Sequence, residues 1–477
     1  MAAGSALTLT SSASPLEGDR LTFHWTTDAP DAKNWVGIYD GSRKPGTGSS
    51  LLWKYTAAAS GDVQLDTSAL TGGPYTAYLL AKDGYEVLAR SAPFSFRPKP
   101  AVVPPHAAVD ALTTAPVAPG SKVSVKLGGL WARPAGNPAG SASYRKVSGP
   151  AWASVGADGT VTGTAPAATG DPEPIVVGVK DSAGAVDTVT LLVPVADAAA
   201  RPRLKAASWN LHDAGAAHTD ALEKQLRVVL SQGLDVLALQ ETAGERAKAL
   251  ADALGWYAHQ SPGSVGILSR HPLTDLRAAT ADLPAVAATV NLPGGRTVRF
   301  WAAHLDETGY GPYAVQDGQG AAQVEAAEKA SLRARQATAL AAALREDLGR
   351  TLTVVLGGAL SSPSHQDWTA ATAAAHQGVG PIAWPVSKAV QGAGLTDAFR
   401  EENPDPAKAP GATWSPTRRR RGEKPEPQDR IDYVWYAGAL KLVEAHTLVT
   451  GWPQAEPNAA ANEWPSDTAA AVATFQL

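Results

Sequence analysis

Polar side chains that could hold a divalent cation or a phosphate group follow several apolar runs in the second half of this 477-residue chain. Asn210 ends KAASWN, Glu241 follows DVLALQ and His304 ends VRFWAAH. Asp432 lies in RIDYVWY, and Asp467 lies in the last such segment, WPSDT. Each run has the length and apolar content of a buried strand, and polar groups at strand ends meet at one edge of a sheet. The pattern predicts a polar site at such an edge.

Each of these residues also has an ordinary structural explanation when it is taken singly. A glutamate directly after a strand, such as Glu241, often begins a helix. An asparagine such as Asn210 often caps a turn. The order of the residues along the chain therefore carries more information than any one of them.

This order is similar to that of the endonuclease/exonuclease/phosphatase superfamily. These are metal-dependent phosphodiesterases related to pancreatic deoxyribonuclease, abasic-site endonucleases and bacterial sphingomyelinases. The resemblance extends over residues 203–477, and its most specific segment is DRIDY at 429–433. It implies a four-layer α/β sandwich of two β-sheets flanked by helices. The alternation of amphipathic and apolar segments over 201–477 favours the same α/β class.

The resemblance also implies a role for each polar position. Glu241 matches the principal metal ligand, Asn210 helps to hold the metal and the phosphate, and Asp467 reaches the metal, usually through water. His304 matches the histidine that contacts a phosphate oxygen, and Asp432 matches the carboxylate that orients this histidine. The implied cofactor is Mg²⁺ or Mn²⁺.

Three positions depart from the family pattern. Ala359, in the segment LGGALS, replaces the aspartate that activates the attacking water, and Ser361 replaces the transition-state asparagine. Thr468 replaces the histidine that stabilises the attacked phosphoryl group. A general base contributes roughly 10²–10⁴ in rate, and one oxyanion-type donor contributes roughly 10²–10³. The sequence therefore predicts an inactive or crippled phosphoesterase scaffold that holds Mg²⁺ or Mn²⁺ weakly. Its expected ligand contains phosphate, as a nucleic acid, a phospholipid headgroup or a phosphate ester.

Two other interpretations stay open. One is an active Mg²⁺- or Mn²⁺-dependent phosphodiesterase or nuclease that activates water with other groups, and the other is a surface adhesin. For the first, His365 and Asp367 belong to the ordinary family pattern, and Asp306 and Glu307 are loop acids without an evident partner. The arginine run at 418–421 is expected to be a solvated patch, with steering of a phosphate-rich polymer as the alternative.

Residues 1–97 and 109–197 predict two immunoglobulin-like β-sandwiches, because short alternating strands are separated by turn residues. The first resembles fibronectin-like modules and the second resembles cadherin-like modules. The proline-rich stretch 97–108 predicts a semi-rigid linker, so the α/β domain occupies 201–477. Aromatic residues of the first module are expected in its core or in cross-strand pairs, with contact to a glycan as the alternative. They are Trp25, Trp35, Tyr39, Trp53, Tyr75 and Tyr78.

Composition sets the remaining limits. Hydrophobic residues make up 44% and charged residues 18% of the chain, which is typical of an ordered globular protein. The net charge of −4 argues against a surface that coats nucleic acid. The absence of cysteine excludes disulfides and thiolate metal sites. No apolar run approaches the roughly 20 residues of a membrane span. The start of the chain lacks a signal core, so the protein is either cytosolic or a mature form whose leader is absent from this chain. We expect the second, an extracellular protein. The Ala-, Gly- and Pro-rich composition suggests a high-GC bacterium.

Overall fold

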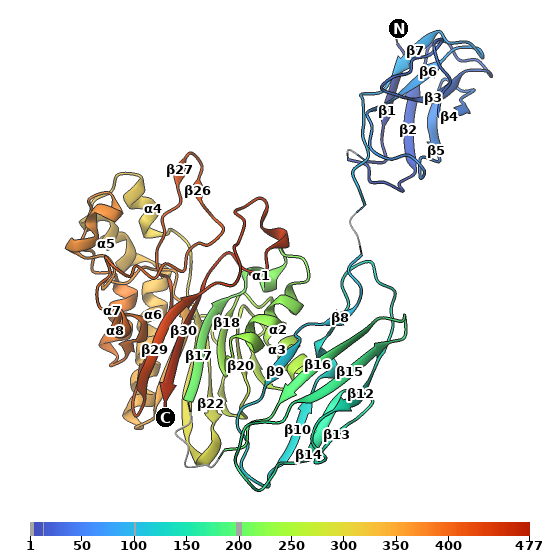
Figure 1. The fold of residues 1–477 in the computed structure, drawn as a ribbon. Coiled ribbons are helices and arrows are strands. Elements are labelled where there is room, and N and C mark those ends of the chain that lie inside the picture. Colours follow the sequence, from blue (N-terminus) through green and yellow to red (C-terminus); the bar gives the residue numbers. More distant parts are fainter. Residues whose placement is uncertain (1–3, 13, 100–101, 197–202) are drawn as a thin grey trace. The chain divides into compact units, whose positions relative to one another are not determined.

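The computed structural model describes residues 4–12, 14–99, 102–196 and 203–477 (Figure 1). They form two compact units, residues 1–102 and 103–477. Part of the predicted linker (100–101) and the predicted boundary near 201 (197–202) lie outside the described residues. Along the described parts of the chain, no helix combines the length and the apolar character needed to cross a membrane.

The first unit is a β-sandwich, as the sequence predicts. Its two sheets have the orders β1-β2-β5 and β4-β3-β6-β7. Along β2, the side chains of Leu21, Phe23 and Trp25 are buried while their neighbours are more exposed, which is the alternation of a half-buried strand. The strands are β1 (Ala6–Leu9), β2 (Leu21–Thr26), β3 (Trp35–Asp40), β4 (Leu52–Tyr55), β5 (Ser60–Leu65), β6 (Tyr75–Leu80) and β7 (Val87–Arg90).

The second unit begins with the other predicted β module. Its sheets have the orders β10-β14-β13, β12-β15-β16-β9 and β11-β8. The strands are β8 (His106–Ala107), β9 (Ala111–Thr113), β10 (Lys122–Lys126), β11 (Trp131–Ala132), β12 (Ala142–Ser148), β13 (Ala153–Val155), β14 (Thr160–Thr164), β15 (Ile175–Asp181) and β16 (Val186–Leu192). Because β8 pairs with β11, the last residues of the stretch predicted as a linker belong to a sheet instead.

The rest of the second unit is the predicted α/β fold. Two six-stranded sheets have the orders β19-β20-β18-β17-β30-β29 and β21-β22-β23-β24-β28-β25. The first contains β17 (Arg203–Asn210), β18 (Val236–Gln240), β19 (Tyr257–Gln260), β20 (Val265–Ser269), β29 (Lys441–Leu448) and β30 (Ala470–Gln476). The second contains β21 (Leu273–Arg277), β22 (Ala285–Asn291), β23 (Thr297–His304), β24 (Val354–Ala359), β25 (Thr396–Asp397) and β28 (Asp432–Ala437). A short hairpin is made by β26 (Arg420–Arg421) and β27 (Lys424–Pro425).

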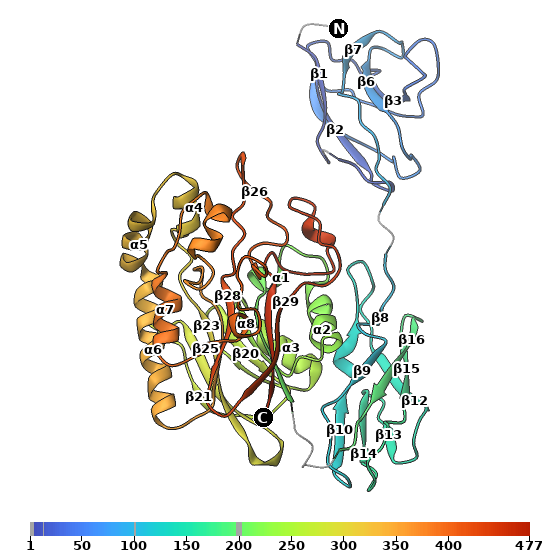
Figure 2. The ribbon, with the colours of Figure 1, turned by 60° about the vertical axis from the view of Figure 1, so that its left-hand side comes forward.

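Helices cover the outer faces of both sheets (Figure 2). The helices are α1 (His212–Gly215), α2 (Ala221–Ser231), α3 (Arg246–Leu254), α4 (Gly311–Gln316), α5 (Ala321–Ala330), α6 (Leu332–Gly349), α7 (Pro385–Gly392) and α8 (Ala398–Glu402). One apolar core lies between the sheets, a second under α6 and α7, and a third under α2 and α3. Strands buried on both faces explain why runs such as VLALQ read as continuously apolar. The four predicted layers are therefore present.

The second β module and the α/β fold share the core that lies under α2 and α3. Gly129 of the module sits so close to α3 that a Cβ atom there would lie 2.2 Å from the carbonyl oxygen of Ala253. His106 Nε2 lies 2.9 Å from Glu223 Oε1, which projects from α2. The two parts are packed together through this shared core.

Candidate functional site

The two sheets end side by side at one end of the α/β sandwich, and the predicted site residues lie there. In the first sheet β17 ends at Asn210, and β18 ends one residue before Glu241. In the second sheet His304, Ala359 and Asp432 are register partners across β23, β24 and β28. Strand pairing within each sheet, together with packing of the two sheets, thus brings five positions that are far apart in the sequence to one edge.

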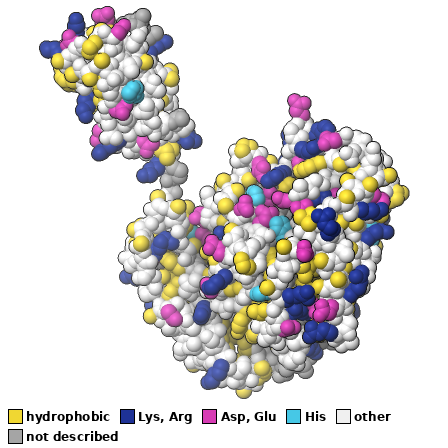
Figure 3. Space-filling view, turned by 180° about the vertical axis from the view of Figure 1, so that it is seen from behind, with side chains coloured by type: hydrophobic (Ala, Val, Ile, Leu, Met, Phe, Trp, Pro, Cys, Tyr) yellow, Lys and Arg dark blue, Asp and Glu magenta, His cyan; other side chains and the backbone are white. Residues whose placement is uncertain are grey.

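These strand ends line a cavity of about 460 Å³. Seven of the eight residues that the sequence singled out lie on its wall: Asn210, Glu241, His304, Ala359, Ser361, Asp432 and Thr468. The wall also includes Glu307, Thr308, Tyr310, Tyr313, Trp414, Arg418 and Ile431. Acidic and histidine side chains gather on one face of this unit (Figure 3). Asp467 lies apart, because it lines a neighbouring cavity of about 300 Å³.

The carboxylate of Glu241 is held by two donors. Asn210 Nδ2 donates to Glu241 Oε1 at 2.6 Å, and the backbone N–H of Asp213 donates to Oε2 at 3.1 Å. The backbone of Glu241 is left-handed, with φ +51°, a conformation that is uncommon for a residue with a side chain and is concentrated at functional sites. The amide oxygen of Asn210 accepts the N–H of His212 at 3.0 Å. Asn210 therefore positions Glu241, and its own oxygen is already engaged.

The imidazole of His304 is held by a serine. Ser264 Oγ lies 2.9 Å from His304 Nδ1. The predicted hydrogen bond from Asp432 to this ring is therefore wrong, because the ring pairs with Ser264 while both oxygens of Asp432 lack a hydrogen-bond partner among the described residues. Burial lowers the pKa of His304, although Glu241 and Glu307 act in the opposite direction. The ring is therefore neutral at pH 7 and can bind a cation through Nε2.

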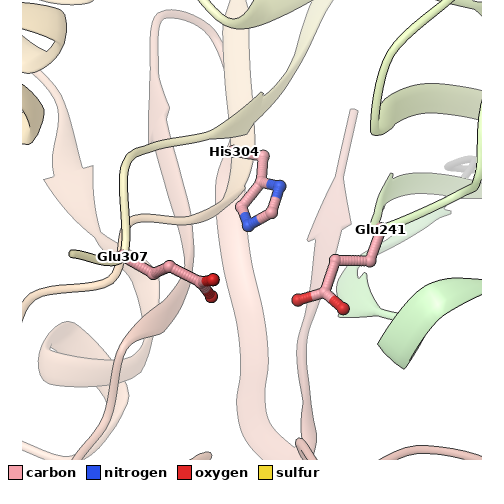
Figure 4. Close-up of side chains that lie close together, drawn as sticks. All are labelled: Glu241, His304 and Glu307. Carbon is pink, nitrogen blue, oxygen red and sulfur yellow. The ribbon is translucent and has the colours of Figure 1, made fainter.

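Three side chains of this cavity could share one metal ion. Ligand atoms of Glu241, His304 and Glu307 lie within 4.8 Å of one another. The two carboxylates approach from opposite sides of the imidazole (Figure 4). Carboxylates suit Mg²⁺ and Mn²⁺ whereas imidazole suits softer ions, so this mixed set fits Mn²⁺ better than Mg²⁺. The sequence predicts Glu307 only as a loop acid without an evident partner, and it does not predict Glu307 as a metal ligand.

Asp467 is engaged outside this cluster. Its Oδ2 lies 3.3 Å from Arg418 Nη2 and 3.6 Å from His212 Nε2. Burial raises the pKa of Asp467, with His212 and Arg418 opposing that rise. Arg418 also stacks on Trp414, with its guanidinium carbon 5.0 Å from the ring centroid. Arg418 lines both cavities and is the cation at the boundary between them.

Residues 207–467 match the model of the endonuclease/exonuclease/phosphatase family. The chain belongs to this family. An uncharacterised Caenorhabditis elegans protein, F14F9.5, is 31% identical over 288 residues, which cover 56% of this chain and 90% of that protein. A Beutenbergia cavernae endonuclease/exonuclease/phosphatase structure is 20% identical, covers 58% of this chain and 72% of its own, and has a TM-score of 0.36. For an Archaeoglobus fulgidus AP endonuclease structure the identity is 17%, the coverage 57% and 100%, and the TM-score 0.38.

At the three positions that the sequence predicts to depart from the family pattern, the structure shows a methyl group and two hydroxyl groups that donate within the protein. Ala359 has only a methyl group. Ser361 Oγ donates to the carbonyl oxygen of Leu305 at 3.0 Å. Thr468 Oγ1 donates to Asp467 Oδ1 at 3.1 Å. Both hydroxyl protons are thus used within the protein.

Asp432 is buried without a partner, although it belongs to the best-matched family segment. Its side chain is fully buried, and burial raises its pKa to about 8, with Asp467 and Glu241 adding to the rise and Thr413 opposing it. At neutral pH this carboxyl is largely protonated. Thr468, where the family has histidine, lies on the wall of the same cavity.

The arginine run at 418–421 does not act as one patch. Arg418 reaches the site, whereas Arg421 pairs with Asp317 at 2.7 Å and lies 4.5 Å from the ring centroid of Tyr313. Arg419 and Arg420 are exposed. The prediction of a solvated patch therefore holds for two of the four arginines.

Proposed function

We propose that the cavity binds a phosphate-containing ligand and hydrolyses it poorly or not at all. The observation that carries this proposal is the state of the three departing positions, where a methyl group and two internally bonded hydroxyl groups replace the base and donors of the family. Members of the family act on phosphoesters, which supports phosphate as the ligand chemistry. Arg418 supplies a charged donor on the cavity wall.

We further propose that a divalent cation binds here weakly, at Glu241, His304 and Glu307. When bound, the cation would neutralise phosphate charge. Asn210 would fix the orientation of Glu241, and Ser264 would fix that of His304. The site offers only two carboxylates, and a low ligand charge gives low affinity.

Turnover of bis-p-nitrophenyl phosphate and DNA with Mn²⁺ or Mg²⁺ tests the proposal. The unaltered chain should show negligible turnover. The combined change Ala359→Asp, Ser361→Asn and Thr468→His should raise the rate by at least ~10², because each group supplies a factor of that order. Adding Glu241→Ala to the triple variant should abolish the gain. Turnover by the unaltered chain that is lost on Glu241→Ala would overturn the proposal.

An active phosphodiesterase is the second candidate, and one observation favours it. Glu307 is an exposed carboxylate on the cavity wall, beside His304 and Glu241. It could accept a proton from water in place of the missing aspartate. If Glu307→Gln removes a measurable turnover of the unaltered chain while Asp306→Asn leaves it intact, this candidate replaces the first.

A further inference from the structure

The first unit carries aromatic side chains on the outer face of the sheet β4-β3-β6-β7. Of its tryptophans and tyrosines, Trp53, Tyr55 and Tyr85 are 55%, 50% and 54% exposed. The sequence predicts that Trp53 lies in the core or in a cross-strand pair. It lies in a cross-strand position on the edge strand β4, but its side chain faces solvent and is not part of the core. Large exposed apolar groups that gather in one place mark interaction sites.

The exposed rings surround a buried one. Trp35 lies beneath them, with ring centroids 6.2 Å from Trp53 and 6.2 Å from Tyr85, at interplanar angles of 78° and 74°. Tyr55 continues the row, 5.1 Å from Trp53 at 79°. A Cβ atom at Gly37 would lie 2.6 Å from the Trp35 ring, so this glycine lets the indole lie across the sheet. Rings at such angles form the walls of a cradle rather than a flat plate.

The cradle is fixed by hydrogen bonds to the turn before β7. Trp35 Nε1 donates to the carbonyl oxygen of Gly84 at 3.2 Å. Tyr55 Oη donates to Asp83 Oδ1 at 2.7 Å, and Lys33 Nζ lies 2.8 Å from Asp83 Oδ2. Aromatic side chains held in this way lose little conformational entropy when a ligand binds.

We propose that this aromatic cradle binds a neutral polysaccharide chain. A sugar ring presents an apolar C–H face, which fits against aromatic rings, and a rim of hydroxyl groups, which need both donors and acceptors. Asp83, Lys33 and the hydroxyl groups of Tyr55 and Tyr85 supply both at the edge of the cradle. Lys33 pairs with Asp83, so this carboxylate is not free to bind an ammonium group over the rings, and a neutral ligand fits better than a cationic one.

Affinity electrophoresis of the full chain tests this proposal. The gels would contain hydroxyethylcellulose, xylan, galactomannan, β-1,3-glucan or glycol chitin. At least one polymer should retard the chain, and the double variant Trp53→Ala, Tyr85→Ala should weaken that retardation at least ~10-fold, because two stacking contacts are lost. Trp452→Ala is the matched control, since Trp452 is 95% exposed and lies in the second unit.

The proposal fails if none of these polymers retards the chain, or if Trp452→Ala weakens retardation as much as the double variant. It also fails if the double variant loses binding to phosphatidylcholine vesicles while no polysaccharide binds, because the surface would then be a membrane contact. Asp83→Asn adds a readout that leaves the rings in place. It should reduce retardation less than the double variant, since it removes only a rim contact.

Discussion

Arg430 and Asp432 are two residues apart in the same family segment and are equally buried, yet their surroundings differ. The guanidinium of Arg430 pairs with Asp367 at 2.9 Å and with Asp397 at 2.8 Å. Arg400 adds a further contact to Asp367 at 2.7 Å. Asp432 has no comparable partner among the described residues. The comparison teaches that two residues of one short segment can differ in role. Arg430 stabilises the fold through its ion pairs, whereas Asp432 is buried without a hydrogen-bond partner in the described part of the chain.

The largest expected effect comes from removing the guanidinium of Arg430, which pairs with two buried carboxylates. Arg430→Met should lower the free energy of unfolding by about 3–5 kcal/mol, because it leaves the carboxylates of Asp367 and Asp397 buried with one cation between them. Urea denaturation followed by tryptophan fluorescence measures the change. Arg421→Met, at an exposed ion pair with Asp317, is the matched control and should change stability little. If Arg430→Met changes the free energy of unfolding only slightly, the ion pairs of Arg430 do not hold the fold together as argued above.

Replacing Asp432, which lacks such a partner, should raise the free energy of unfolding instead of lowering it. The pKa of Asp432 is about 8 in the folded chain, above the roughly 4 of an unfolded aspartate. Between these values the folded chain holds a proton that the unfolded chain releases, so stability falls as pH rises. Asp432→Asn should therefore stabilise the chain by about 3–5 kcal/mol at pH 8, because each pKa unit corresponds to about 1.4 kcal/mol, and have almost no effect at pH 4.

Denaturation at both pH values, with EDTA present, checks this expectation. Asp429, whose pKa is raised to about 6 by burial, titrates in the same sense in both proteins. The difference in the free energy of unfolding between the unaltered chain and the Asp432→Asn variant therefore reports on Asp432. An equal effect at pH 4 and pH 8 would show that Asp432 does not titrate between these values on unfolding, and would contradict the expectation.

The smallest effect concerns the carboxylates that face the cavity. Glu241→Ala should weaken Mn²⁺ binding at least ~10-fold, or about 1.4 kcal/mol, because one of two anionic ligands is lost. Glu307→Gln should weaken it by a similar factor. Asp467→Asn should change it less than ~3-fold, because Asp467 pairs with Arg418. Isothermal titration calorimetry distinguishes these cases, and a large effect at Asp467 would restore the ligand set that the sequence predicted.

Strand patterns predicted most of the fold. Runs such as DVLALQ and VRFWAAH were apolar enough to mark buried strands, and their ends carried the residues that line the cavity. Partners across loops were not predictable, because Ser264 and Glu307 owe their contacts to the positions of chain segments rather than to a local pattern. The outward direction of Trp53 was also hidden, since a tryptophan on an edge strand reads the same whether it faces the core or solvent. The ion pair of Asp83 with Lys33 was likewise not predictable, because the two residues are distant in the sequence and meet only in the folded chain.

The apolar core under α2 and α3 has a consequence for how this protein can be recombined. Val123 and Leu130 of the second β module contribute to that core together with Leu226 and Leu250 of the helices. If residues 203–477 were produced alone, the apolar side chains of α2 and α3 that pack against the second β module would be exposed to water. Residues 103–477 are therefore expected to be the smallest part that keeps both helices covered, because the second β module supplies one side of their core. The first unit has a core of its own.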